Sequence, residues 1–247
     1  MVDLALLWSS RTQGFYLHER REVCVGKPRV SYVRCPICSY VFRTQSAGTY
    51  VTVGREPDLC PKFPGSASDG SRRIQHGVTM CPACSFATGE GFDGLDLTFD
   101  ERSDIEERLR EDGLLKVFRE NPPPWLAFHA AVVCGKERGL RAHDLGDLCL
   151  RASWVCRKER EQPFESTFQL RAVRHFMRSL QEDGLFGREL SVTAYLVGEL
   201  NRRLGRHREA LNWYVNAERT LDDIGNDLAW LNRLISRQSE LAREQAA

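Results

Sequence analysis

Four cysteines arranged in two closely spaced pairs are the residues of this sequence best suited to chemistry. The pairs lie in two copies of one signature, Cys35-Pro36-Ile37-Cys38-Ser39-Tyr40 and Cys81-Pro82-Ala83-Cys84-Ser85-Phe86, each of which reads Cys-Pro-x-Cys-Ser-aromatic. The two-residue spacing lets both sulfurs of a pair reach one ion through a tight turn, and four thiolates suit a tetrahedral Zn²⁺ at roughly 2.3 Å. We therefore predict one structural Zn²⁺ bound by Cys35, Cys38, Cys81 and Cys84.

The turn that each pair forms should be stiff and slightly strained. Proline after the first cysteine fixes one backbone angle, and backbone N–H groups can then point at the sulfurs and offset their negative charge. The position after the second cysteine is usually glycine, because the chain often turns left-handed there, but here it is Ser39 or Ser85. A non-glycine residue in that conformation costs on the order of 1 kcal/mol, which is small beside the ~10 kcal/mol or more of structural zinc binding.

Other uses of these thiols stay open at the level of sequence. The same four sulfurs would accept iron as in rubredoxin, which makes iron the minor alternative to zinc. A redox dithiol can also read Cys-Pro-x-Cys, but such motifs occur singly at a helix N-terminus, so the duplication disfavours that interpretation. Cys60 and His76 lie between the pairs and are possible alternative ligands, although a packed thiol and a surface imidazole are the simpler interpretation.

The remaining cysteines are interpreted as structural. Cys24 resembles Cys60 in having no second ligand close by in the sequence, and Cys134, Cys149 and Cys156 fall on apolar faces of expected helices. We expect them to pack as small hydrophobic side chains. The stretch between the two cysteine pairs, residues 39–80, is longer than the ~15–20 residues of a compact ribbon, so it must contain strands of its own.

The composition is that of an ordinary globular protein. The chain has 247 residues, of which 42% are hydrophobic and 28% are charged, and its formal net charge is +1. This charge gives no general attraction to nucleic acid or to an anionic membrane. No apolar stretch approaches the ~18 residues that span a bilayer, and the first residues do not resemble a secretory signal. We therefore expect a cytoplasmic protein with reduced thiols and no membrane span.

The chain changes character near residue 95. Before it, short apolar runs predict strands at residues 15–17, 30–33 and 49–53, followed by an irregular connection over residues 57–71. After it, apolar residues recur with helical spacing, and Gly and Pro only separate segments. We predict an N-terminal extension (1–30) that could form a strand, a zinc-binding domain (31–98) and a helical domain (99–247).

The helical half should consist of amphipathic helices that pack in chain order. One helix is expected over residues 100–120 with a break at Gly113, and another begins at Pro122-Pro123-Pro124. Two apolar stripes follow, at residues 145–156 and 168–180. The last helices are predicted at residues 190–204, 207–222 and 226–244.

Residues 194–221 resemble a tetratricopeptide repeat. Gly198 lies in the first helix, Gly205 at the turn, and Ala210, Tyr214 and Ala217 on the second helix. Small residues there let two helices approach closely while Tyr214 fills the gap beside them. The usual terminal proline is absent. Because about three such units are needed to bury a continuous core, we expect a degenerate array that is capped by the last helix.

The fold class that follows is α+β. We expect a small β-rich domain with zinc-ribbon or rubredoxin-like knuckles, followed by an antiparallel, tetratricopeptide-like helical array.

Taken together, these segments resemble a largely bacterial family of uncharacterised proteins, the domain-of-unknown-function family numbered 2225. The resemblance covers residues 32–221 and rests on the two Cys-Pro-x-Cys pairs and on three further runs: Arg55-Glu56-Pro57-Asp58-Leu59-Cys60, Asp147-Leu148-Cys149-Leu150-Arg151-Ala152-Ser153-Trp154 and Gly198-Glu199-Leu200-Asn201-Arg202-Arg203-Leu204-Gly205. The resemblance implies paired knuckles ahead of tetratricopeptide-like helices, and it brings no known activity. Ser39 and Ser85 stand where that pattern favours glycine.

The leading functional hypothesis is a non-enzymatic, zinc-stabilised module for protein–protein interaction or scaffolding. Helical arrays present a concave face to extended or helical peptides. If the last unit follows repeat geometry, its partner-binding side chains are Tyr195, Glu199, Arg202 and Arg203. The alternative for these four is the solvated side of an amphipathic helix. The partner and the oligomeric state do not follow from the sequence.

Nucleic-acid binding and catalysis are the two alternative classes of function. Nucleic-acid binding through the zinc domain would use Arg34, Arg43, Arg72 or Arg73 on phosphates and Tyr32 or Tyr40 for stacking, but residues 1–94 carry only 11 basic against 8 acidic side chains. An enzyme would need a site between the two domains that no motif reveals, since phosphate-binding loops, nucleophile elbows and zinc-protease helices are lacking. Nucleic-acid binding and catalysis are therefore secondary hypotheses.

Overall fold

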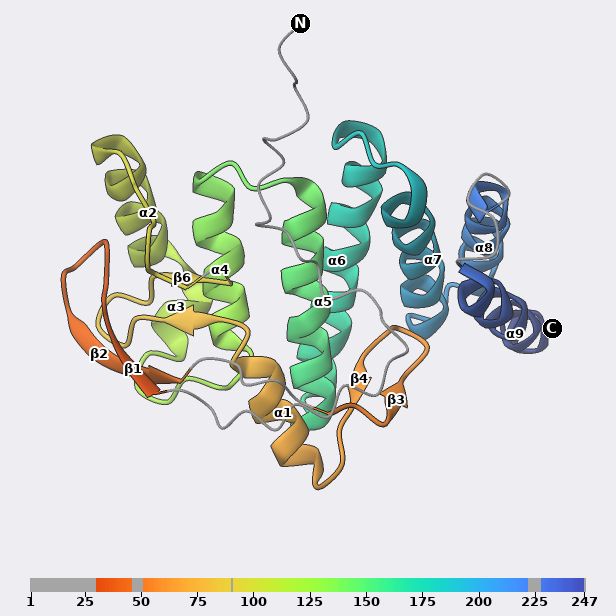
Figure 1. Ribbon diagram of the computed structural model, residues 1–247, viewed down its shortest axis with the longest axis horizontal. Coiled ribbons are helices and arrows are strands. Elements are labelled where there is room, and N and C mark those ends of the chain that lie inside the picture. The colour runs from red at the N-terminus through yellow and green to blue at the C-terminus, as the bar shows by residue number, and fades with distance from the viewer. Residues whose placement is uncertain (1–29, 46–50, 90, 222–227, 247) are drawn as a thin grey trace, which may run out of the picture.

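The computed structural model describes residues 30–45, 51–89, 91–221 and 228–246 (Figure 1). Within these residues, the strands form three antiparallel pairs: β1 (Val30–Arg34) with β2 (Val41–Gln45), β3 (Gly54–Arg55) with β4 (Pro61–Lys62), and β5 (Thr79–Met80) with β6 (Ala87–Thr88). The helices are α1 (Ala67–Gln75), α2 (Phe99–Glu111), α3 (Gly113–Val117), α4 (Leu126–Glu137), α5 (Ala142–Lys158), α6 (Gln162–Glu182), α7 (Gly187–Arg203), α8 (His207–Leu221) and α9 (Ala229–Ala246). The chain is therefore mixed but mostly helical, with its small strand pairs towards the N-terminus.

The helices stack in chain order. In Figure 1, α4, α5, α6 and α7 stand side by side, α8 and α9 continue the row, β1–β2, α1 and β3–β4 lie along its lower part, and β6 lies beside α4. The most extensive contacts join α5 to α6 and α7 to α8. No helix of the described residues combines the length and apolarity needed to cross a membrane.

The helix boundaries agree with local sequence signals. Thr98 caps α2 in a capping box, because the Glu101 N–H donates to its hydroxyl and the Thr98 N–H donates to the Glu101 carboxylate. The predicted break at Gly113 lies one residue earlier, at Asp112. The Asp112 carboxylate accepts the N–H groups of Leu114 and Leu115 and so begins α3.

Two expectations about the N-terminal half were wrong. Residues 57–71 were expected to be irregular, but they contain β4 and the start of α1, whose polar sequence hides a helix that packs on α5. Residues 51–53 form no strand, although the Val53 N–H donates to the Lys62 carbonyl beside the β3–β4 pair. Residues 15–17, 49 and 50 lie outside the described residues.

The close contact of α7 with α8 depends on a glycine, Gly198, which has no side chain. A Cβ atom added to Gly198 would lie 2.8 Å from the ring of Tyr214, which is fully buried. The predicted packing of Tyr214 beside a small residue is thereby confirmed. Whether the whole row follows tetratricopeptide geometry remains a prediction.

One hydrophobic core joins the strand pairs to the helices. Its buried residues run from Val33 in β1 to Ala242 in α9. The link is α4, which packs on both β5 and β6, and its Cys134 lies beside the backbone of Ala87. The cysteine-bearing segments are therefore seated on the helical row.

A second link is the loop between β3 and β4, which docks on α5 and α7 through charged groups. The Asp58 carboxylate is fully buried, and it accepts hydrogen bonds from the Arg157 guanidinium, which also binds Glu56 at 2.5 Å. Arg203 lies 3.4 Å from Asp58. The Tyr195 hydroxyl donates to the Pro57 carbonyl oxygen at 2.7 Å. This loop therefore covers the face of the row formed by α5 and α7.

The docking of this loop corrects the expectation that Tyr195, Glu199, Arg202 and Arg203 form an open partner-binding face. Tyr195 and Glu199 have no exposed surface. The Glu199 carboxylate accepts from Arg202 at 2.8 Å, from Arg203 at 2.8 Å and from the Tyr214 hydroxyl at 2.9 Å. Helical periodicity identifies this side of α7 as polar, but the polar side faces the chain's own loop and α8, where each charge has an intramolecular partner.

The buried pair of Asp58 and Arg157 yields a stability prediction. Arg157→Met leaves the buried Asp58 carboxylate with the Cys60 N–H and the more distant Arg203, and we expect it to lower the free energy of unfolding by about 3–5 kcal/mol in urea denaturation. The matched control is Arg178→Met, whose exposed pair with Glu182 should contribute less than about 1 kcal/mol. The double variant Asp58→Asn/Arg157→Met should recover part of the loss. Equal effects of Arg157→Met and Arg178→Met would contradict the importance of this contact.

The close approach of α7 and α8 yields a second prediction. Gly198→Ala forces the Tyr214 ring to shift in a tightly packed site, and we expect a loss of about 1–3 kcal/mol in the free energy of unfolding. Gly113→Ala is the control, because nothing lies within 4 Å of the added methyl group. This control should be neutral or slightly stabilising, by up to about 1 kcal/mol. A Gly198→Ala variant as stable as the control would show that the helices separate freely.

Candidate metal centre

The two cysteine signatures form two turns of nearly identical geometry. The first joins β1 to β2 and the second joins β5 to β6. In the first turn the Ser39 N–H donates to the Cys35 carbonyl at 3.0 Å and the Cys35 N–H to the Tyr40 carbonyl at 2.9 Å. The equivalent bonds in the second turn measure 2.9 and 2.8 Å. A repeated sequence has thus produced a repeated hairpin knuckle.

The serine after each second cysteine adopts the left-handed conformation that was expected there. The φ angle is 62° for Ser39 and 64° for Ser85. Both serines are also the donors of the hydrogen bonds that close the turns. The sequence departs from glycine at these positions, but the backbone keeps the shape that brings the two sulfurs of a pair together.

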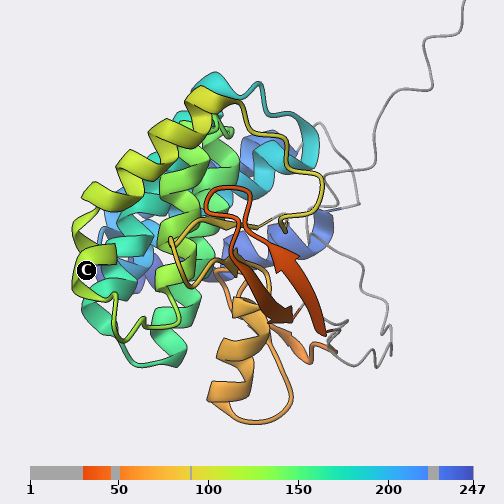
Figure 2. The same cartoon turned by 90° about the vertical axis from the view of Figure 1, so that its left-hand side faces the viewer.

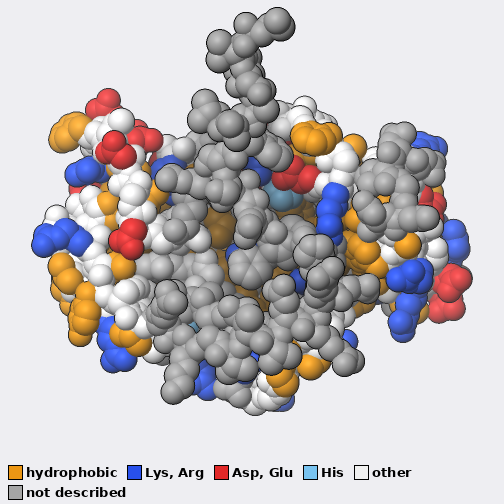
Figure 3. Space-filling model, viewed as in Figure 1, with side chains coloured by type: hydrophobic (Ala, Val, Ile, Leu, Met, Phe, Trp, Pro, Cys, Tyr) orange, Lys and Arg blue, Asp and Glu red, His pale blue; other side chains and the backbone are white. Residues whose placement is uncertain are grey.

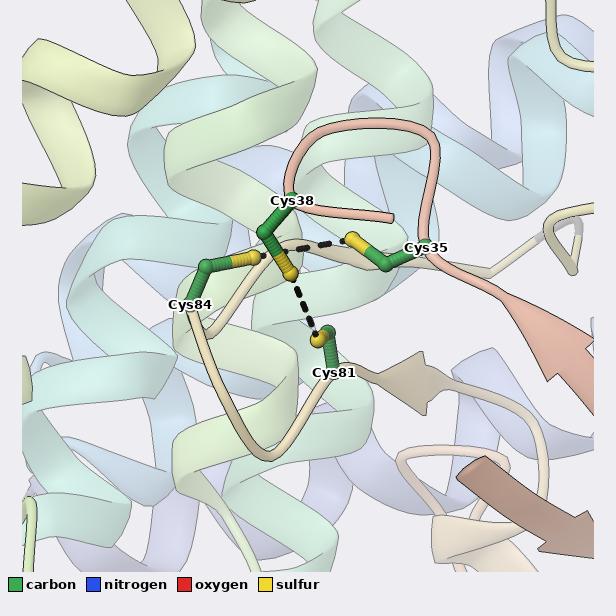
Figure 4. A group of neighbouring side chains, drawn as sticks. All are labelled: Cys35, Cys38, Cys81 and Cys84. Carbon is green, nitrogen blue, oxygen red and sulfur yellow. Dashed lines mark hydrogen bonds between the residues drawn. The ribbon is translucent and has the colours of Figure 1, made fainter. Parts of the chain in front are cut away.

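The two knuckles face each other, and their four sulfur atoms converge on one point (Figure 4). All four Sγ atoms lie within 4.8 Å of one another, and the Cys35–Cys84 and Cys38–Cys81 Sγ pairs are each 3.6 Å apart. Ligands at roughly 2.3 Å in a tetrahedron would be about 3.8 Å apart. The predicted cysteine cluster is confirmed as a group that could hold a metal ion.

The thiols differ in burial and in proton affinity. Cys35 and Cys81 are buried, Cys84 is half-buried and Cys38 is exposed. The hydrogen bond with Cys84, helped by backbone N–H groups in its own turn, lowers the pKa of Cys35 to about 5. The same hydrogen bond raises the pKa of Cys84, and burial raises the pKa of Cys81 to about 11. A cation bound among the four sulfurs would favour the thiolate form of each.

The two knuckles are supported unequally by the rest of the protein. The second is embedded, since Phe86 and Ala87 have no exposed surface and β5 and β6 pack on α4. The equivalent aromatic residue of the first, Tyr40, is 50% exposed. Phe92 contacts both knuckles, with its ring edge-on to Phe42 at a centroid distance of 5.7 Å and tilted against Phe86 at 5.2 Å. The first hairpin therefore projects from a base that the second provides.

The other candidate ligands lie elsewhere. The cluster of the described residues contains neither Cys60 nor His76. Cys60 is fully buried in the β3–β4 loop, where burial raises its pKa to about 12. Burial likewise raises the pKa of Cys134 and Cys149 to about 12, and both pack in the core as expected, with Cys156. Cys24 lies outside the described residues.

Sequence reasoning missed the charged contacts that fix the β3–β4 loop. In the sequence, the run from Arg55 to Cys60 indicates only a family resemblance. In the structure, Asp58 and Glu56 of this run bind Arg157. Leu59 adopts a left-handed φ of 65° and is buried, with 2% of its surface exposed. Two carboxylates on either side of a proline, between short strands, indicate a loop that binds a cationic side chain. The neighbouring sequence does not show that this side chain is Arg157.

The left-handed serines yield a prediction for the site. Ser39→Gly relieves the strain of a side chain at positive φ, so its unfolding free energy should equal that of the parent or exceed it by up to about 1 kcal/mol. Ser39→Val places a β-branched side chain at the same angle and should lose at least about 1 kcal/mol. Both variants keep the four thiols. Thermal unfolding with metal analysis checks this, and a valine variant as stable as the glycine variant would be inconsistent with the left-handed turn.

Comparison with known proteins gives one match. A family model described as an uncharacterised protein conserved in bacteria, DUF2225, matches residues 31–238. No curated protein and no solved structure matches the chain. The matched region contains both knuckles, the docked β3–β4 loop and all of the helices from α1 to α8. The chain belongs to the uncharacterised bacterial family DUF2225.

Proposed function

We propose that the four cysteines bind one structural Zn²⁺, and that the protein is a non-enzymatic interaction module stabilised by this ion. The observation that carries the proposal is the convergence of four sulfurs from two matched knuckles within 4.8 Å. Four sulfur donors in a tetrahedral arrangement are the ligand set of structural zinc sites. Iron would fit the same sulfurs, and it is the alternative that metal analysis separates.

The donor set supports a structural role. A zinc ion with four cysteine ligands has no open position for water or substrate, whereas catalytic zinc sites keep one. The ion would connect hairpins that are far apart in the sequence and so hold the first hairpin against the second. Thiolate ligands also require a reducing compartment, so we place the protein in the cytoplasm.

An interaction module needs a surface that is available to a partner. The polar side of α7 is used within the chain, because Tyr195 binds the Pro57 carbonyl and Glu199 binds Arg202 and Arg203. We therefore assign the partner surface to the segment that carries the two cysteine knuckles. The projecting first hairpin supports this choice.

Metal analysis of the purified chain tests the proposal. We expect one zinc per chain by plasma mass spectrometry, and loss of that zinc in Cys35→Ser and in Cys81→Ser. Both variants should unfold at lower temperature than the parent, while the helical circular dichroism at room temperature is largely retained, because most residues of the shared core lie in the helices. Cys60→Ala is the matched control and should keep its zinc.

Two results would reject the zinc site. One is a parent protein that binds neither zinc nor iron when purified under reducing conditions. The other is a pair of cysteine variants that keep the parent's metal content and melting temperature. Stoichiometric iron with the visible absorption of an iron–thiolate centre would replace zinc and keep the structural role.

A further inference from the structure

The first hairpin has one face that points away from the molecule. Side chains alternate along a strand, and the exposed set comprises Val30, Tyr32 and Arg34 of β1 with Val41, Arg43 and Gln45 of β2. We call these six residues the ribbon face. Figure 2 shows the hairpin standing in front of the helices, and in Figure 3 hydrophobic and basic side chains adjoin at its place on the lower left.

The ribbon face exposes unusually large apolar side chains. Tyr32 is 76% exposed, and Val30 and Val41 are 46% and 49% exposed. The register places Tyr32 opposite Arg43 and Arg34 opposite Val41. These two cross-strand pairs lie two residues apart, which is about 7 Å along the ribbon. Apolar and positively charged side chains thus lie next to each other on one face of the two-stranded ribbon.

Among the described residues, no carboxylate neutralises the two arginines of the ribbon face. Residues 23–55 contain no aspartate or glutamate. Within the part of the chain that the structure describes, no carboxylate forms an ion pair with Arg34 or Arg43. By contrast, Arg157, Arg202 and Arg203 each bind carboxylates of this chain. The two ribbon guanidinium groups are therefore available to carboxylates from outside.

The composition of the face matches the centre of a protein–protein interface. Such centres are enriched in tyrosine and arginine and depleted in lysine, aspartate and glutamate. Residues 30–45 contain tyrosine, phenylalanine and arginine, and they contain no lysine, aspartate or glutamate. A two-stranded ribbon is also incomplete as a sheet, because three or more strands or a packed face are needed for independent stability. In the described residues, β1 and β2 pair only with each other.

We propose that the ribbon face binds an extended, acidic segment of another protein. Carboxylates at positions i and i+2 of that segment point to one face of it and would pair with Arg34 and Arg43, while apolar side chains at positions i−2 and i+4, on the same face, would cover Tyr32 and the two valines. This inference rests on the proposed function, because the metal ion holds the hairpin in place. It adds the surface and the chemistry of the partner.

The same observations disfavour nucleic acid as the occupant. Single-stranded nucleic acid is bound by a continuous positive groove with several stacking rings. The ribbon face offers two guanidinium groups and one ring, because Tyr40 belongs to the other side of the hairpin, where it stacks on Phe42 at 6.4 Å.

The test uses the full, metal-loaded chain and a labelled extended peptide that carries valine, glutamate, glutamate and valine at alternate positions, with threonine between them, so that all four face the same side. Its matched control is the same peptide with lysine in place of glutamate, and oligothymidylate is the nucleic-acid probe. By fluorescence anisotropy we expect the acidic peptide to bind and the lysine peptide not to bind. In the parent, backbone NMR shifts caused by the acidic peptide should cluster at residues 30–34 and 41–45.

Variants of the ribbon face make the test specific. Arg34→Glu/Arg43→Glu and Tyr32→Ala should each weaken the acidic peptide about tenfold or more, because the first reverses two charges and the second removes the main apolar contact. Arg233→Glu/Arg237→Glu carries the same change of charge on the exposed side of α9 and should bind as the parent does.

The inference is overturned if the acidic peptide does not bind the metal-loaded parent, if the α9 control loses as much affinity, or if the NMR shifts lie away from the ribbon. Binding of oligothymidylate through Arg34 and Arg43, with no binding of the peptide, would overturn it in favour of nucleic acid. Metal content is measured on every sample. If the parent contains metal but does not bind the peptide, only this inference is refuted. If the purified parent contains no metal, the proposed function is refuted.

Discussion

The arrangement of the N-terminal half depends on bringing four sulfur atoms to one point. Thiols gain little from such an approach, and thiolates at this distance repel one another, so a cation among the four sulfurs would stabilise the cluster. Closing the loop between the two knuckles also costs chain entropy, which grows slowly with the length of the loop. A single strong centre can therefore hold together a segment whose own strand pairs are very short, as β3–β4 and β5–β6 are.

The rest of the molecule is organised around two anchors to that segment. One is apolar, where α4 covers β5 and β6. The other is charged, where Asp58 and Glu56 meet Arg157 and Arg203. A buried carboxylate of this kind adds little net stability by itself, but it fixes position, because any displaced arrangement leaves a charge without its partner. The helical row thereby fixes the position of the segment that carries the four cysteines.

The sequence predicted what is local and missed what is long-range. The cysteine pairs, the left-handed serines and most helix limits follow from spacing, backbone preference and periodicity, which are properties of neighbouring residues. Helix α1 was missed because its run of small and charged residues has no apolar stripe of the usual kind. The role of α7 was misread for a different reason. Amphipathic spacing shows that Glu199 and Arg203 share a polar side, but it cannot reveal that a loop more than a hundred residues earlier covers that side.

The unequal seating of the two knuckles sets an order of events for the metal-free chain. The second knuckle has Phe86 and Ala87 inside the core and would stay close to its place, whereas the first buries Val33 and Cys35 but leaves Tyr40 half exposed. Removal of the ion would accordingly release the outer hairpin while its counterpart remains docked. The inner knuckle then persists as a half-formed template with two cysteines already in position, onto which the outer pair can close when metal returns.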